Sequence, residues 1–91
     1  MKVTNMTSDR TGREVPNQFI IEDDQGNQYF QSYRTVIAKK DWSGDRLQVT
    51  LDNQWDYSKT TGKYRNMFLG ETRKETEAKI KDGTYTVTNL N

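Results

Sequence analysis

Apolar residues in the first half of the chain come in short runs separated by turn-forming residues. Residues 19–21, Phe-Ile-Ile, are such a run: Pro16 and Asn17 precede it, and the polar segment 23–27 follows it. Short β-branched and aromatic runs bounded by Pro, Asn, Asp and Gly are typical of a strand that enters a tight turn. We therefore predict a strand at 19–21, a turn at 23–27 and a returning strand at 29–33.

The clearest period-two pattern lies near the middle of the chain. Leu47, Val49 and Leu51 alternate with polar residues, which predicts a strand with one buried face. Residues 42–45, Trp-Ser-Gly-Asp, separate this strand from an apolar run that begins at Ile37, and the whole segment predicts a β-hairpin.

Part of this first half is also compatible with a helix. Five apolar residues fit helical spacing: Tyr29, Phe30, Tyr33, Val36 and Ile37. We favour strands because β-branched and aromatic residues dominate the segment.

The second half has the signals of a first helix. Ser58 is a suitable N-cap, and Gly70 is a suitable stop for a helix that ends at about Leu69. One face of this helix is predicted to pack on the sheet: Thr61, Tyr64, Met67 and Phe68.

A second helix and a last strand follow. Thr72 and Glu75 form a Thr-x-x-Glu capping box, which predicts a helix that ends near residues 82–83, with Ala78 and Ile80 as its main apolar anchors. This sparsely apolar helix is expected to lie on the surface. Residues 84–90 alternate Thr with Tyr85 and Val87, which predicts a terminal strand at a sheet edge.

These elements together predict an α+β fold in a single domain spanning 1–91. An antiparallel sheet of four to five strands is built by residues 2–52, a helical hairpin by 58–82 and a final short strand by 84–90. A chain of 91 residues buries only roughly 60 to 65% of the surface that its unfolded form exposes, so we expect a thin core and modest stability.

The composition is polar but typical of a folded chain. Hydrophobic residues make up 31% and the mean hydropathy is −1.11, yet aromatics reach 11% and the net charge is only +1. Low net charge with many aromatics favours folding over disorder, so we expect a small soluble domain. This even charge balance does not indicate a partner that binds mainly through electrostatic attraction.

Missing residue types exclude several kinds of chemistry. The chain has neither cysteine nor histidine, so disulfides, thiol catalysis, zinc–thiolate sites and imidazole general bases are excluded. It also has no apolar run long enough to span a bilayer and no signal peptide, so we expect a cytoplasmic protein without a membrane partner. We expect no enzyme activity, no catalytic residues and no cofactor.

Carboxylate groups are the remaining candidates for metal chemistry. Residues 22–24, Glu-Asp-Asp, and the pair Asp52 and Asp56 near Lys59 could hold Mg²⁺ or Ca²⁺. The first group is more typical of a solvated turn, and Asp56 precedes a helix start, where a negative charge is favourable. We therefore predict no metal site.

The segment 55–65 is the best candidate for contact with a partner. It places aromatic rings among cations, hydroxyls and amides, a combination that is enriched where proteins touch partners or stack on bases. Trp55 and Tyr64 could instead seal the helix against the sheet, whereas Tyr57 is expected to stay exposed. Six residues are predicted to contact a partner: Trp55, Tyr57, Lys59, Lys63, Tyr64 and Arg65.

Several stretches spread over nearly the whole chain resemble a family of small, largely uncharacterised proteins encoded in phages and prophages of Gram-positive bacteria. The residues that carry this resemblance lie at 15–21, 29–38, 55–58, 60–64, 68–69 and 88–91. The resemblance implies a phage-infected bacterial cytoplasm, and it carries over no functional residues.

The function expected in that setting is non-enzymatic. Small phage proteins of this kind often bind and inhibit or modulate a host protein, such as a host defence factor like a CRISPR nuclease. The alternative is a small nucleic-acid-binding module that uses the aromatic and basic cluster. Either a monomer or a small homo-oligomer is compatible with the sequence.

Overall fold

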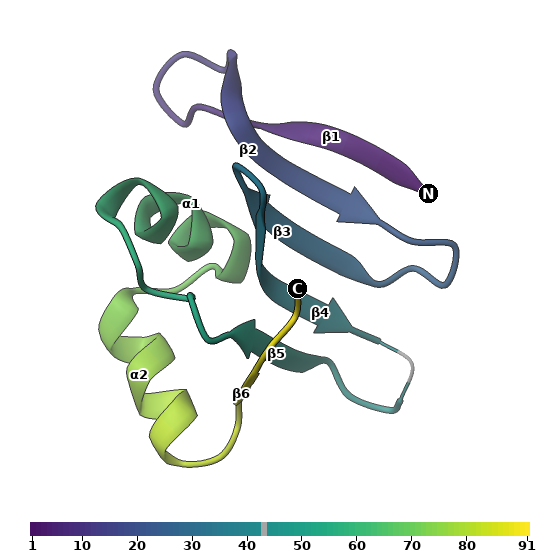
Figure 1. Cartoon of the computed structure of the whole chain (residues 1–91), viewed down its shortest axis with the longest axis vertical. Coiled ribbons are helices and arrows are strands. Elements are labelled where there is room, and N and C mark those ends of the chain that lie inside the picture. Colours follow the sequence, from purple (N-terminus) through teal and green to yellow (C-terminus); the bar gives the residue numbers. More distant parts are fainter. Residues whose placement is uncertain (43) are drawn as a thin grey trace.

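The computed structural model describes residues 1–42 and 44–91 and has the predicted α+β architecture (Figure 1). The elements follow one another as β1 (Lys2–Thr7), β2 (Glu14–Glu22), β3 (Gln28–Ser32), β4 (Thr35–Asp41), β5 (Gln48–Asp52), α1 (Lys59–Leu69), α2 (Arg73–Lys81) and β6 (Thr86–Thr88). The strand reading of residues 29–37 is confirmed, since they form most of β3 and the first part of β4, with Tyr33 and Arg34 in the turn between the two strands. The predicted hairpin is β4–β5, and Ser43 in its turn lies outside the described residues.

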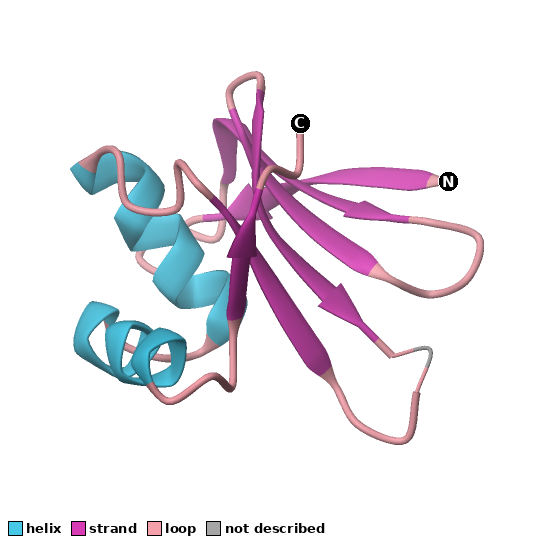
Figure 2. Ribbon diagram, turned by 60° about the horizontal axis from the view of Figure 1, so that its bottom comes forward, coloured by secondary structure: helices cyan, strands magenta, loops and turns pink. Residues whose placement is uncertain are grey.

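Six strands form one sheet in the order β1-β2-β3-β4-β5-β6. Neighbouring strands are antiparallel from β1 to β5, whereas β6 pairs in parallel with β5. A parallel pair needs a long crossover, which α1 and α2 supply between β5 and β6. Both helices lie on the same side of the sheet (Figure 2).

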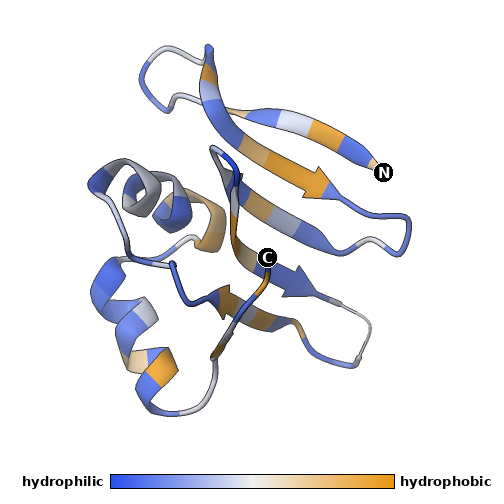
Figure 3. Cartoon of the chain, viewed as in Figure 1, coloured by the Kyte–Doolittle hydropathy of each residue, from blue (hydrophilic) through white to orange (hydrophobic). Residues whose placement is uncertain are grey.

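The core forms where this side of the sheet meets α1. Ile20, Phe30, Ala38 and Leu51 lie side by side across four strands, and the last three are completely buried. Phe68 of α1 stacks on Phe30 with ring centroids 5.9 Å apart. Hydrophobic residues accordingly concentrate in the strands and at the end of α1, while α2 is mainly hydrophilic (Figure 3).

Strand β2 begins earlier than the sequence suggests, at Glu14, and therefore contains Pro16 and Asn17. Pairing between β2 and β3 starts only at Gln18, so Pro16 lies where β2 has no β3 neighbour that would need its missing N–H. Asn17 has a positive φ of 66°, and its carbonyl accepts a 2.7 Å hydrogen bond from the Tyr33 amide.

The ends of both helices are confirmed, but their buried faces differ from the prediction. Met67 is 37% exposed, and its predicted place on the buried face of α1 is taken by Arg65. In α2, Ala78 is exposed and Thr76 is buried instead. The Thr76 hydroxyl hydrogen bonds to Glu71 and to the carbonyl of Thr72, and these bonds allow a polar residue to be buried there. No helix in the described ranges is long and apolar enough to cross a bilayer.

The last two residues tie the chain end to the middle of the sequence. The Asn91 side chain accepts a hydrogen bond from Val36 N (2.8 Å) and donates to Val36 O (3.0 Å), as a neighbouring strand would. Leu90 N and Asn91 Nδ2 also donate to the buried carboxylate of Asp52, at 2.7 and 3.0 Å. Asp52 is therefore a structural anchor of the C-terminal segment.

Candidate functional site

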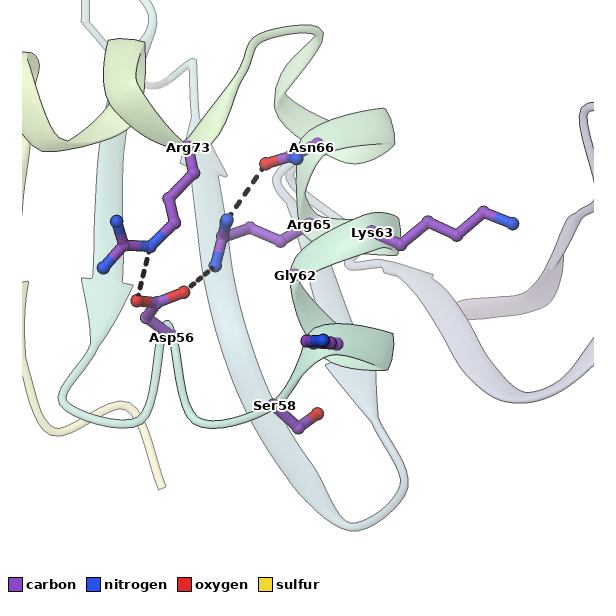
Figure 4. Close-up of a pocket in the computed structure, with 8 residues that line it drawn as sticks. Asp56, Ser58, Gly62, Lys63, Arg65, Asn66 and Arg73 are labelled. Atoms are coloured by element: carbon purple, nitrogen blue, oxygen red, sulfur yellow. Dashed lines mark hydrogen bonds and ion pairs between the residues drawn. The ribbon is translucent and has the colours of Figure 1, made fainter.

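An open pocket of about 740 Å³ lies beside α1, next to the start of α2 and the turn that precedes α1. Its lining residues are mostly basic or polar, and we call the site the basic pocket (Figure 4). They are Asp56, Ser58, Lys59, Gly62, Lys63, Arg65, Asn66 and Arg73.

Local sequence fixes one wall of the basic pocket through α1. Ser58 is extended, and its hydroxyl accepts a 3.1 Å hydrogen bond from Thr61 N, which starts the helix. Helical spacing of three, four and seven residues then places four side-chain positions along one side of α1. These positions are Lys59, Gly62, Lys63 and Asn66.

The other wall begins at Arg73, the first residue of α2. Thr72 and Glu75 form the predicted capping box, in which each residue accepts a hydrogen bond from the other's backbone N–H. The box holds the start of α2 in place, and with it the base of the Arg73 side chain.

Arg65 is buried with only 1% of its surface exposed. Its Nη1 donates to the Trp55 carbonyl at 2.8 Å and to Asp56 at 3.1 Å, and its Nη2 donates to Asn66 at 3.0 Å. The guanidinium also lies 5.0 Å from the centre of the Trp55 ring, within the range of a cation–π interaction. Arg65 therefore joins α1 to the turn before it.

Asp56 connects the two walls. One carboxylate oxygen accepts from Arg65, and the other accepts from Arg73 Nε at 2.7 Å. Arg73 also pairs with Glu77 at 2.9 Å, one helical turn further along α2. Hydrogen bonding to Asp56, together with the charges of Asp56 and Glu77, raises the pKa of the Arg73 guanidinium, so it stays charged.

The basic pocket carries an excess of positive charge. Four cationic side chains line it against the single carboxylate of Asp56. In the part of the chain that the structure describes, neither Lys59 nor Lys63 lies within ion-pairing distance of a carboxylate. The start of α1 lies at the pocket, and the positive end of the helix dipole adds to this potential. The first turn of α1 has no acidic residue that would offset it. Such a pocket is suited to binding an anionic group.

The six residues predicted to contact a partner fall into two groups. Tyr57 is 49% exposed, and Lys59 and Lys63 are also exposed, so these three can touch a partner directly. Tyr64 is 8% exposed and Arg65 is 1% exposed, while Trp55 is partly buried against the core. These last three lie beneath the exposed surface of the site. Tyr64 thus packs in the interior, which was the alternative considered for it.

Sequence reasoning did not include Gly62, Asn66 or Arg73 among the contact residues. Gly62 and Asn66 share helical spacing with Lys59 and Lys63, so the predicted helix was a sufficient signal for them. Arg73 belongs to the second helix, and only the folded chain brings it to the Trp55–Asp56 turn.

The carboxylates weighed as metal ligands have structural partners. Asp23 accepts hydrogen bonds from the backbone N–H groups of Gln25 and Asn27, both at 2.9 Å, which is the predicted solvated turn. Asp52 anchors the C-terminal segment, and Asp56 bridges two arginines. Within residues 1–42 and 44–91, no three acidic side chains form a group that could hold a metal ion.

A second polar cluster connects α2 to β6. Glu71 accepts hydrogen bonds from the Thr76 hydroxyl (2.6 Å), Lys79 Nζ (2.6 Å) and the Tyr85 hydroxyl (2.9 Å). Burial alone would raise the pKa of Glu71, but these three bonds outweigh it and lower the pKa. The ionised Glu71 therefore joins the loop before α2 to that helix and to the approach to β6.

Comparison with known proteins identifies a family but no individual relative. No curated protein and no solved structure matches the chain significantly. The family model of DUF8033, described as a family of unknown function, matches residues 1–84. That match spans all elements up to the loop before β6, and the chain therefore belongs to the DUF8033 family.

Proposed function

We propose that this chain is a non-enzymatic binding protein that docks on an acidic surface of a partner protein through the basic pocket. The observation that carries the proposal is that Lys59, Lys63 and Arg73 line one open depression with a single resident carboxylate. Tyr57, half exposed and two positions before Lys59, adds an aromatic contact of the kind that anchors protein interfaces.

The alternative, a nucleic-acid-binding module, has less support from the same residues. Binding of a single strand uses several exposed aromatic rings on which successive bases stack. Of the three rings in the segment, Tyr64 is buried and Trp55 is partly buried under two arginines, which leaves Tyr57. Residues 71–82, which contain α2, carry four acidic residues against four basic ones, so this helix extends no basic track for a phosphate backbone.

The setting of the proposal comes from the resemblance to phage-encoded proteins. In a phage-infected bacterium the partner would be a host protein, and occupation of its acidic surface would inhibit or modulate it. Host defence factors such as CRISPR nucleases are one class of such partners, because a nuclease inhibitor can act by contact alone. This part of the proposal rests on the resemblance and on the expected lack of catalytic residues.

The test is a pull-down from host bacterial lysate, with and without nuclease, using a charge-reversal variant. Lys59→Glu with Lys63→Glu reverses two exposed charges of the basic pocket. The matched control, Lys74→Glu with Lys81→Glu, reverses two exposed charges on α2 outside it. We expect a host protein to co-purify in stoichiometric amounts with the parent chain, with or without nuclease treatment. The control variant should still bind this protein, and the pocket variant should not.

Other outcomes would argue against protein docking. Recovery of nucleic acid, with all accompanying proteins lost after nuclease, would favour the binding-module alternative. A partner retained equally by both double variants would place the interface elsewhere on the chain. A titration with salt adds a second criterion, because phosphate binding weakens steeply with ionic strength, with a slope of about −0.7 to −0.9 per contact.

A further inference from the structure

We infer that Asp56 occupies, in the free protein, the position that a carboxylate of the partner takes in the complex. The ligand class is an aspartate or glutamate side chain on an acidic protein segment. This inference rests on the proposed function, because it requires an acidic partner. It adds that carboxylates are exchanged at the site between Arg65 and Arg73: the carboxylate of the partner displaces that of Asp56.

The geometry around Asp56 is that of a bound anion. Its two oxygens accept from two different guanidinium groups, Arg65 at 3.1 Å and Arg73 at 2.7 Å (Figure 4). The two arginines come from different helices, and both lie near the Trp55 ring, with Cζ atoms 5.0 and 6.0 Å from its centre. Guanidinium groups are common protein recognition elements for carboxylates.

Asp56 is open to solvent on the Arg73 side of this position. It lies in the turn before α1, and its side chain is 28% exposed. Both hydrogen bonds found for its carboxylate within the described ranges go to the two arginines. One of these arginines, Arg73, is 54% exposed, and exposed ion pairs contribute little to stability. Because Arg65 is buried, the Asp56 side chain can turn toward water only when another carboxylate takes its place at Arg65.

Arg65 has more hydrogen-bonding capacity than its present partners use. Its Nε is buried and makes no hydrogen bond among the described residues. A buried donor without a partner is unfavourable, and native proteins rarely leave one. The free protein therefore leaves this guanidinium incompletely satisfied.

Gly62 supports the same reading. It lies inside α1, where glycine is less favourable than alanine. A Cβ at this position would meet the Arg65 guanidinium at 3.5 to 3.8 Å, an ordinary contact, so packing does not require the glycine. Glycine instead leaves space beside the guanidinium within the basic pocket. A more stable helix is thus forgone beside Nη1, the Arg65 nitrogen that bonds Asp56 and would bond the incoming carboxylate.

The test uses a six-residue glutamate peptide as the acidic probe and a six-residue glutamine peptide as the uncharged control. Isothermal titration at low salt compares the full chain with Asp56→Asn, which removes the competing charge at nearly constant shape. Glu77→Gln is the matched control, because it removes the other carboxylate on Arg73 without touching Arg65. We expect Asp56→Asn to bind the glutamate peptide at least about tenfold more tightly. Glu77→Gln should change the affinity by less than about twofold.

A second variant leaves Asp56 in place. Gly62→Ala should raise the melting temperature, because alanine favours the helix, and lower the affinity for the glutamate peptide about fivefold by filling the space beside Arg65. These opposite signs separate a ligand site from a structural position. Unchanged or weaker peptide binding by Asp56→Asn, or unchanged binding by Gly62→Ala, would overturn the exchange.

The outcomes also separate this inference from the proposed function. If the full chain binds the glutamate peptide through Lys59 and Lys63 but Asp56→Asn binds no better, docking on an acidic partner stands and the exchange fails. If no form of the chain distinguishes the glutamate from the glutamine peptide, both fail. A preference of every form for a twelve-residue oligothymidylate would likewise overturn both, in favour of nucleic acid.

Discussion

Arg65 donates a 2.8 Å hydrogen bond from its guanidinium to the main-chain carbonyl of Trp55, ten positions earlier. A residue type that usually lies on the surface is thereby built into the interior, at 1% exposure. The bond closes the turn between β5 and α1 and brings Asp56 to the edge of the basic pocket. Arg65 therefore has two roles, one in stability and one in shaping the pocket.

The first prediction concerns the stability role of Arg65. Arg65→Ala removes the hydrogen bonds to Trp55, Asp56 and Asn66 together with the packing of the side chain, and should lower the free energy of unfolding by about 3 kcal/mol. Urea denaturation followed by circular dichroism measures this. Lys63→Ala, an exposed change on the same helix, should stay within about 0.5 kcal/mol of the parent. Equal midpoints for the two variants would contradict the interior role of Arg65.

The second prediction concerns the chain end. Asn91→Ala removes two hydrogen bonds to Val36 and one to Asp52, and should cost about 2 kcal/mol in the free energy of unfolding. Asn91→Asp should cost at least as much, because it places a carboxylate beside Asp52. The exposed change Lys81→Ala serves as the control in the same urea titration. A parent-like midpoint for Asn91→Ala would show that the C-terminal contacts do not stabilise the sheet.

The third prediction is the pH dependence of stability. Burial by itself raises the pKa of Asp52, but the hydrogen bonds from Leu90 N, Gln54 N and Asn91 Nδ2 outweigh it, and the folded-state pKa lies below the ordinary value of 3.8. Glu71 and Asp23 are shifted in the same direction. Carboxylates with a lowered pKa stabilise the fold fully above their unfolded-state pKa. This contribution is lost as the pH falls through the folded-state pKa.

Stability should therefore fall steeply below about pH 4, the unfolded-state range of these carboxyls. Asp52→Asn should be less stable than the parent at pH 7, since its amide cannot accept all the hydrogen bonds that the carboxylate accepts. The difference between the two should shrink as the pH falls below 4, because protonation removes the advantage of the parent. Urea titrations at several pH values measure this difference. A constant difference from pH 7 to pH 2 would mean that Asp52 does not contribute through its charge.

The fourth prediction tests the contact between α2 and the approach to β6. Tyr85→Phe removes the 2.9 Å hydrogen bond to Glu71 and should lower the free energy of unfolding by about 1 kcal/mol. Tyr57→Phe is the matched control, since Tyr57 is exposed and its hydroxyl has no hydrogen bond among the described residues. Thermal unfolding of the two variants decides the point. An equal effect of both substitutions would place the Tyr85 hydroxyl outside the stabilising network.

Much of the fold could be predicted from the sequence because its signals act over a few residues. Ser58, Gly70 and the Thr72–Glu75 capping box mark the helix ends through hydrogen bonds within one turn. The alternation of Leu47, Val49 and Leu51 marks a strand through the period of the backbone. The wall of the basic pocket formed by α1 could be predicted in the same way, since Lys59 and Lys63 lie one turn apart on a helix whose start the sequence marks.

The tertiary structure decided what depends on residues far apart in the chain. The burial of Arg65 in place of Met67 follows from hydrogen-bond acceptors in the Trp55–Asp56 turn, and helical spacing alone does not locate them. Arg73 reaches the basic pocket through the packing of a second helix, and Asn91 reaches Val36 across 55 positions. The sequence by itself determined both helices and the location of most strands, because capping and periodicity are local. The composition of the pocket and the anchoring of the chain end were decided by contacts that form only when separate elements pack together.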